Sequence, residues 1–118
     1  MILSDNILKI IEENGFAYDI EYQVDEDYCV ELGQYTPAGE DWWYTIWFNG
    51  SDEDFINSLR KLVYDFDVDD EAEVWIHSRG KNGVSSSIKV LVEDAEWKYK
   101  QLENLLDALE RYKIIRGE

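Results

Sequence analysis

The sequence predicts an α+β domain: a three-stranded antiparallel meander with one helix before it and three after it, in the order α-β-β-β-α-α-α. Three segments alternate apolar and polar residues with a period of two, as half-buried strands do. Before and after them, apolar residues recur every three or four positions, as on amphipathic helices. The chain has 118 residues, a length typical of one domain, so residues 1–118 are expected to form a single unit.

The first helix is expected at residues 5–14, with Ser4 as its N-cap and Asn14-Gly15 as its end. The strand segments are residues 16–22, 28–32 and 42–48. Turn-forming residues fill the two connections, around 24–27 and 36–39, which favours antiparallel pairing of successive strands.

Ser51 is expected to start the second helix, because Asp54 lies three residues later in the position of a capping-box partner. Residues 69–78 fit either a short helix or a strand, and we favour a helix that ends near Gly80. A loop at 81–84 then precedes a long helix from about Ser86 to residue 112. Helices that follow a three-stranded sheet should pack on one of its faces.

Alternation assigns each strand residue to a face of the sheet. The expected core face carries Phe16, Tyr18, Ile20, Tyr22, Tyr28, Val30, Leu32, Tyr44, Ile46 and Phe48. The opposite face carries Asp19, Glu21, Cys29, Glu31, Trp43, Thr45 and Trp47. Carboxylates beside tryptophans are typical of an interface that binds Arg and Lys through cation–π contacts and charge-assisted hydrogen bonds. The alternative is that Trp43 and Trp47 lie beneath the first helix or the 36–41 loop.

Charge is divided unevenly along the chain, which has 27 acids, 11 bases and a net charge of −16. Residues 1–78 hold 20 acids and three bases, a net of −17, whereas residues 79–118 hold seven acids and eight bases, a net of +1. Direct binding to nucleic acid or to an anionic membrane is disfavoured, because phosphate contacts need clustered Lys and Arg. Cationic partners are expected instead.

Groups that could carry catalysis are scarce. Cys29 is the only cysteine, so no intramolecular disulfide can form, and a reducing compartment, the cytoplasm, is expected. His77 is the only histidine, and beside Trp75 and Ile76 it is expected to be a partly buried structural residue. No phosphate-binding or dinucleotide motif occurs, and zinc lacks a set of ligands. We therefore predict neither an enzyme nor a cofactor.

Residues 65–73 hold six carboxylates in nine positions. Asp65, Asp67 and Asp69 have the alternate spacing that begins an EF-hand loop, but Asp70 occupies the position that needs glycine and Ile76 the position that needs glutamate. A calcium site is therefore not expected. Repulsion among these acids opposes folding, so they serve either to solvate the domain or to receive a cationic surface.

Several segments between residues 65 and 97 resemble uncharacterised small acidic proteins of bacterial phages and conjugative elements. The resemblance rests on Asp65-Phe-Asp67, Trp75-Ile76, the run from Arg79 to Ile88, and Leu91 to Trp97. It transfers no catalytic residue, and it implies a setting in which inhibitors of restriction and of CRISPR nucleases are encoded. In charge, length and lack of catalytic groups, the chain is also similar to DNA-mimic inhibitors, whose carboxylates imitate phosphates.

The leading prediction is a non-enzymatic inhibitor that binds a basic protein surface, such as that of a host nuclease or other DNA-binding enzyme, in an anti-restriction or anti-CRISPR role. Its predicted partner-binding residues are Asp19, Glu21, Glu31, Trp43, Trp47, Asp52, Glu53, Asp54, Asp65, Asp67, Asp69, Asp70, Glu71 and Glu73. The rival prediction is an assembly module that forms a homodimer through the long helix at 86–112, where acids and bases balance. A metal-dependent hydrolase built from carboxylates ranks third.

Overall fold

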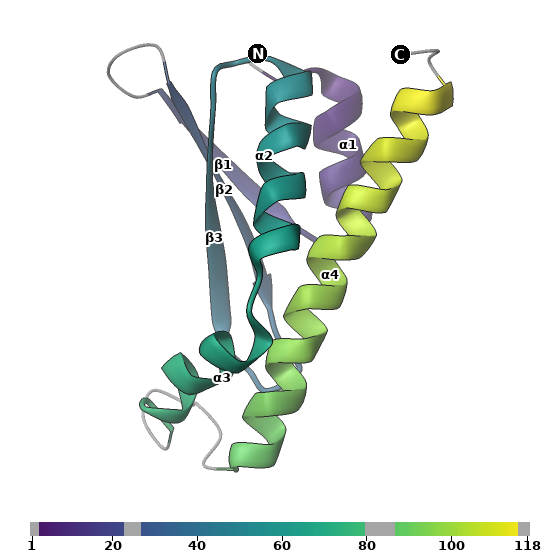
Figure 1. Cartoon of the computed structure of the whole chain (residues 1–118). Coiled ribbons are helices and arrows are strands. Elements are labelled where there is room, and N and C mark those ends of the chain that lie inside the picture. The colour runs from purple at the N-terminus through teal and green to yellow at the C-terminus, as the bar shows by residue number, and fades with distance from the viewer. Residues whose placement is uncertain (1–2, 23–26, 80–86, 116–118) are drawn as a thin grey trace.

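A computed structural model describes residues 3–22, 27–79 and 87–115 of the chain (Figure 1). Its elements are α1 (Asp5–Glu13), β1 (Ala17–Tyr22), β2 (Tyr28–Tyr35), β3 (Asp41–Phe48), α2 (Asp52–Asp65), α3 (Val68–Ile76) and α4 (Ile88–Ile115). The predicted order α-β-β-β-α-α-α is confirmed. The second strand continues to Tyr35, three residues further than predicted, because Gly33 to Tyr35 keep pairing with β3. The connection around 24–26 and the loop at 81–84 lie outside the described residues. The prediction that the short helix ends near Gly80 is wrong, because α3 ends at Ile76 and residues 77–79 form a turn.

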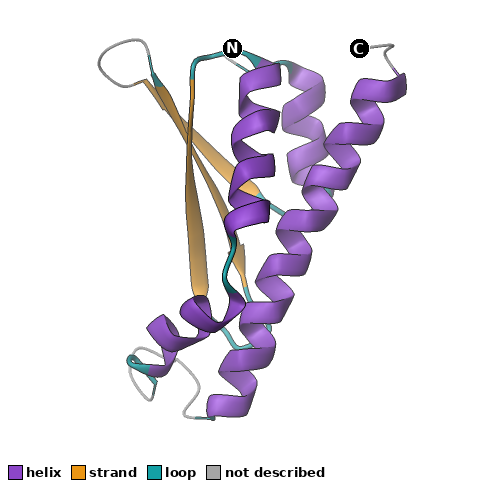
Figure 2. Cartoon of the chain, in the orientation of Figure 1, coloured by secondary structure: helices purple, strands orange, loops and turns teal. Residues whose placement is uncertain are grey.

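The strands form a sheet in the order β1-β2-β3, and both pairs are antiparallel. Helices α1, α2 and α4 pack on one face of this sheet, and α3 lies at one end of it (Figure 2). The predicted packing of the helices on a single face is therefore confirmed. The opposite face, which we call the outer face, carries no described helix.

The core lies between the helices and the predicted core face of the sheet. Val30 and Leu32 are fully buried in β2, and Ile46 and Phe48 are buried in β3. The remaining described members of the predicted set also belong to the core or pack against it, namely Phe16, Tyr18, Ile20, Tyr28 and Tyr44. The side chain of Tyr22 lies outside the described part. Trp42, which the sequence analysis did not place in the core, is also buried there.

The connection between β3 and α2 is short and held by side-chain caps. Gly50 has a φ of +102°, a conformation that glycine adopts without strain. Ser51 Oγ then accepts a hydrogen bond from the Asp54 N–H at 3.1 Å, as predicted for an N-cap. In a full capping box, the Asp54 carboxylate would in turn accept a hydrogen bond from the Ser51 N–H. It accepts one from the Asn49 N–H at 2.8 Å instead, so only half of the predicted capping box forms. The result is a helix that starts directly beside the strand it follows.

Residues 68–76 form the short helix α3, which confirms the helical prediction for the ambiguous segment. The apolar repeat of α4 is confirmed in its centre, where Leu102 and Leu109 are fully buried. The spacing of apolar residues every three or four positions along this helix predicts that Ile88 is its first buried member. Ile88 is instead 48% exposed, because the first turn of α4 extends beyond the end of the sheet (Figure 1). Leu105, which that prediction does not include, is fully buried.

Candidate functional site

The outer face gathers the residues that period-two alternation assigned to it. Strand register places them in rows across the sheet: Asp19, Glu31 and Thr45 in one row, and Glu21, Cys29 and Trp47 in the next. Trp43 is 47% exposed and Trp47 is 53% exposed. The alternative that these tryptophans lie beneath the first helix or the 36–41 loop is therefore wrong, because both rings are about half exposed and α1 packs on the other face, as every described helix on the sheet does (Figure 2).

Trp43 is held in place on this face by two neighbours. Its indole lies over Gly33, where a Cβ would come within 2.5 Å of the ring. Its Nε1–H donates a hydrogen bond to Asp41 Oδ1 at 2.8 Å. The glycine therefore leaves room for the ring, and the carboxylate orients it, so that an exposed aromatic surface is fixed before any partner arrives.

The charge of the outer face is of one sign. The three strands contain Asp19, Glu21, Glu31 and Asp41 and no Lys or Arg. Asp19 and Glu31 are directly opposite across β1 and β2, an arrangement of like charges that destabilises a sheet. Within the described chain, no cation pairs with either carboxylate.

Cys29 and His77 occupy different parts of the fold. Cys29 lies on the outer face of β2 and is buried by its neighbours, and burial, followed by Glu31, Glu21 and Asp19, raises the pKa of its thiol. Because the thiolate is the nucleophile, this environment disfavours the reactive form of Cys29. His77 follows α3 and is exposed, 3.7 Å from Glu73. The prediction of a partly buried His77 is wrong, because α3 buries its Ala72 side instead.

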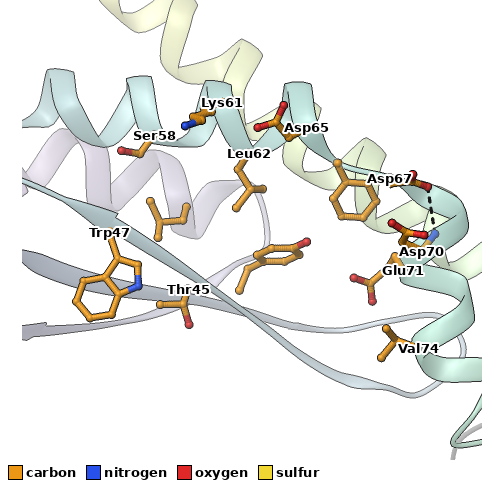
Figure 3. A pocket seen from close by; sticks show the side chains of 13 residues that line it. Thr45, Trp47, Ser58, Lys61, Leu62, Asp65, Asp67, Asp70, Glu71 and Val74 are labelled. Atoms are coloured by element: carbon orange, nitrogen blue, oxygen red, sulfur yellow. Dashed lines mark hydrogen bonds between the residues drawn. The ribbon is translucent and has the colours of Figure 1, made fainter.

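A second acidic surface borders the outer face at β3. A groove of about 640 Å³ runs between β3 on one side and α2 and the start of α3 on the other (Figure 3). Asp65, Asp67, Asp70 and Glu71 line it, together with a single base, Lys61. Trp47 lines the groove and also belongs to the outer face, so the two surfaces are continuous.

The acidic segment 65–73 divides into structural and free carboxylates. Asp67 is the N-cap of α3, and its Oδ1 accepts hydrogen bonds from the backbone N–H groups of Asp69 and Asp70 at 3.0 and 3.1 Å. Glu71 Oε2 accepts from Lys98 Nζ and from Trp75 Nε1, each at 2.8 Å. The carboxylates of Asp65, Asp69 and Asp70 make no such bond within the described residues.

The alternate spacing of Asp65, Asp67 and Asp69 thus marks a junction between two helices. Asp65 ends α2, Asp67 caps α3 and Asp69 lies in the first turn of α3. In the described chain, no three His, Cys, Asp or Glu side chains converge in a way that could hold a metal ion.

The acids at the start of α2 are mainly structural. Asp52 Oδ1 accepts a hydrogen bond from the Ser4 N–H at 3.0 Å, which joins the start of α1 to α2. Asp54 binds the Asn49 N–H. Glu53 alone among the three has a carboxylate without a described hydrogen bond. Two of these three carboxylates are therefore already engaged within the chain.

A buried polar cluster was not predicted. Lys98 is 1% exposed, and its Nζ lies 2.6 Å from Glu40 Oε2 and 2.8 Å from Glu71 Oε2. The same ammonium lies 4.6 Å from the Trp75 ring centre. A signal for it existed in the sequence, because Lys98 falls on the apolar stripe of α4 between the buried residues Ala95 and Leu102.

Glu40 and Asp94 complete this cluster. Burial raises the pKa of Glu40 to about 7, and the hydrogen bond with Asp94 adds to the rise, while Lys98 opposes it. Two carboxylates can bond to each other only if one holds a proton. Asp94 Oδ1 also accepts from the Ala38 N–H at 3.1 Å. The cluster thus joins the 36–40 turn and α3 to α4.

No protein-family model, curated protein or solved structure matches the chain. None of the described helices combines the length and the apolar character needed to cross a bilayer.

Proposed function

We propose that the chain is a non-enzymatic protein that binds a basic protein surface on its outer sheet face. One observation carries the proposal: the uncovered face holds two half-exposed tryptophans among carboxylates, with no base in the three strands. Arginine and lysine fit such a surface, since they form charge-assisted hydrogen bonds with carboxylates and stack on indole rings. The burial of Cys29 and the enclosure of the Glu40 cluster direct attention to this face and away from catalysis.

The more specific form of the proposal concerns the partner. We propose that it is a nucleic-acid-binding enzyme, such as a host nuclease, and that the chain blocks access of nucleic acid in an anti-restriction or anti-CRISPR role. Support comes from the sign of the charge, because a surface built to bind phosphates presents clustered Arg and Lys. Carboxylates on the strands of the sheet offer negative charges to such a surface at fixed positions.

Affinity capture from bacterial lysate, followed by identification of the bound proteins, tests this proposal when matched variants are compared. The outer-face variant is Glu21→Gln with Glu31→Gln. The control is Glu13→Gln with Glu96→Gln, which makes the same change in net charge on exposed helix residues. We expect the wild type and the control to retain a basic nucleic-acid-binding protein, and we expect duplex DNA or salt to release it. The outer-face variant should not retain this protein. Equal retention by all three proteins would refute the proposal.

A further inference from the structure

Strand β3 forms one edge of the sheet, and its outer edge is unpaired in the described part of the chain. It pairs with β2 without a break, from Tyr28↔Phe48 to Tyr35↔Asp41. At such an edge, alternate residues turn their backbone N–H and C=O groups away from the sheet. Proteins usually block an edge with lysine, proline or a bulge. Strand β3 has none of these, and α2 and α3 leave a groove beside its edge.

The groove follows this edge. Four consecutive residues, Tyr44 to Trp47, line it. Because successive residues of a strand point to opposite faces, four in a row can line one groove only where that groove runs along the edge of the strand. Figure 3 shows Thr45 and Trp47 on this side, with Ser58 and Leu62 of α2 across from them. Its volume of about 640 Å³ falls within the roughly 300–1,000 Å³ of ligand-binding sites.

The walls of the groove indicate the chemistry of its occupant. Leu62 and Phe66 supply apolar surface, and four carboxylates face a single lysine, Lys61. Asp65 is the last residue of α2, where the helix dipole disfavours a negative charge. Asp65 and Asp70 have no hydrogen-bond or ion-pair partner for their carboxylates within the described residues. A second copy of this chain would bring further carboxylates to the groove, whereas a cationic strand would neutralise those already there.

The following inference rests on the proposed function and specifies how the partner is recognised. We propose that an extended segment of the partner, with lysine or arginine among its residues, adds to β3 as a fourth strand and fills the groove. Main-chain hydrogen bonds to the free edge hold the segment, and its side chains determine specificity. Its cationic side chains reach Asp65 and Asp70, and Trp47 provides an aromatic surface at the rim.

A peptide probe tests this inference on the full chain. The first peptide is capped and alternates lysine with valine. The second peptide has the same sequence with N-methyl groups on alternate backbone nitrogens. These groups remove main-chain hydrogen-bond donors and leave the charge unchanged. A third peptide has glutamate in place of lysine. Affinity is measured by calorimetry, and amide hydrogen exchange of the protein is measured with and without each peptide.

We expect the lysine peptide to slow exchange at the outward-facing amides of β3. We expect the N-methylated peptide to bind at least about tenfold more weakly, since it loses several main-chain hydrogen bonds at once. The glutamate peptide should not bind. If both lysine peptides bind equally and no β3 amide is protected, strand addition is refuted while docking on the outer face stands. If neither lysine peptide binds, the inference fails, and the capture experiment with the outer-face variant decides the proposed function separately.

A pair of protein variants locates the contact. Asp65→Asn with Asp70→Asn removes two carboxylates of the groove that hold no structural hydrogen bond, so the fold should persist. We expect this variant to bind the lysine peptide about tenfold more weakly, as for the loss of two charged contacts. Glu13→Gln with Glu96→Gln, with the same net charge, should bind as the wild type does. Equal weakening by both variants would show that total charge, and not the groove, attracts the peptide.

Discussion

At the scale of single residues, Glu31 lies directly opposite Asp19 on the outer face. Like charges in this position destabilise a sheet by up to roughly 1 kcal/mol. We therefore expect Glu31→Gln to raise the free energy of unfolding by a few tenths to about 1 kcal/mol, measured by urea denaturation. The same substitution should weaken binding to a cationic partner.

The control for this prediction is Glu96→Gln on α4, which changes the net charge equally but faces no carboxylate across a strand pair. It should leave stability nearly unchanged. A loss of stability in Glu31→Gln would mean that Glu31 has a structural role within the sheet.

Glu40 predicts a dependence of stability on pH. Its pKa is raised from 4.5 to about 7 in the folded chain, so the folded state keeps a proton that the unfolded state loses as the pH rises from about 4.5. The contribution of Glu40 to the free energy of unfolding therefore falls as the pH rises from about 4.5 to 7, and it stays constant above that range. A shift of this size corresponds to roughly 3 kcal/mol. Glu40→Gln, which cannot titrate, should remove this part of the slope.

The measurement is urea denaturation of both proteins at several pH values between about 5 and 8. The many other carboxylates of the chain titrate in wild type and variant alike, so the difference between the two curves isolates Glu40. Parallel curves would contradict the assignment of this proton to the buried cluster.

Single buried polar residues were the least predictable part of the molecule. Lys98 lies at a core position of α4, yet the sequence alone does not name its partners, because Glu40 and Glu71 come from distant segments. His77, in contrast, is exposed although apolar residues precede it in the sequence. Apolar neighbours in sequence do not predict burial here, because α3 packs by one side only.

At the scale of elements, α3 depends on Asp67 as its N-cap. We expect Asp67→Ala to lower the free energy of unfolding by about 1 kcal/mol, the usual effect of losing such a cap. Asp67→Asn should keep stability within a few tenths of a kcal/mol, because asparagine caps equally well. Urea denaturation of the two variants separates the cap from the charge.

An equal loss in both variants would show that the negative charge, and not the hydrogen bonds, holds the start of α3. The pair also shows how the acidic segment should be probed. Alanine at Asp67 or Glu71 removes a structural bond, whereas amide substitutions at Asp65 or Asp70 remove charge from the groove alone.

Most elements could be predicted because local signals agree with tertiary packing. Ser4 and Ser51 cap their helices as predicted, and period-two alternation assigned Trp43 and Trp47 to the correct face. The groove could not be predicted in this way, since it arises where α2 and α3 come to lie beside the edge of β3. That arrangement depends on how the helices pack, which no local pattern encodes.

At the scale of the whole molecule, the excess of acids in residues 1–78 is distributed in a definite way. Part of it stays uncompensated on the outer face and in the groove, while other acids cap helices or join the buried cluster. Among the described acids of residues 1–78, some therefore have structural partners within the chain, and others, on the outer face, in the groove and on the helix surfaces, have none.

The homodimer that was predicted through the long helix can be tested by size. The apolar stripe of α4 packs within its own chain, where Leu102, Leu105 and Leu109 are fully buried. Acidic grooves on two copies would also repel each other. We expect light scattering at micromolar concentration to give the mass of one chain, 13.9 kDa. A mass of two chains would support the assembly module instead.

The central claim, that the outer face and its adjoining groove receive a basic partner, is tested most directly by mapping where a cationic probe binds. In NMR spectra of the full chain titrated with an arginine-rich peptide, we predict that shifts concentrate on the strand amides around Asp19, Glu21 and Glu31 and on the indole signals of Trp43 and Trp47. Shifts spread equally over the exposed acids of α1 and α4 would contradict the claim, because they would show that the peptide follows total charge and recognises no particular surface.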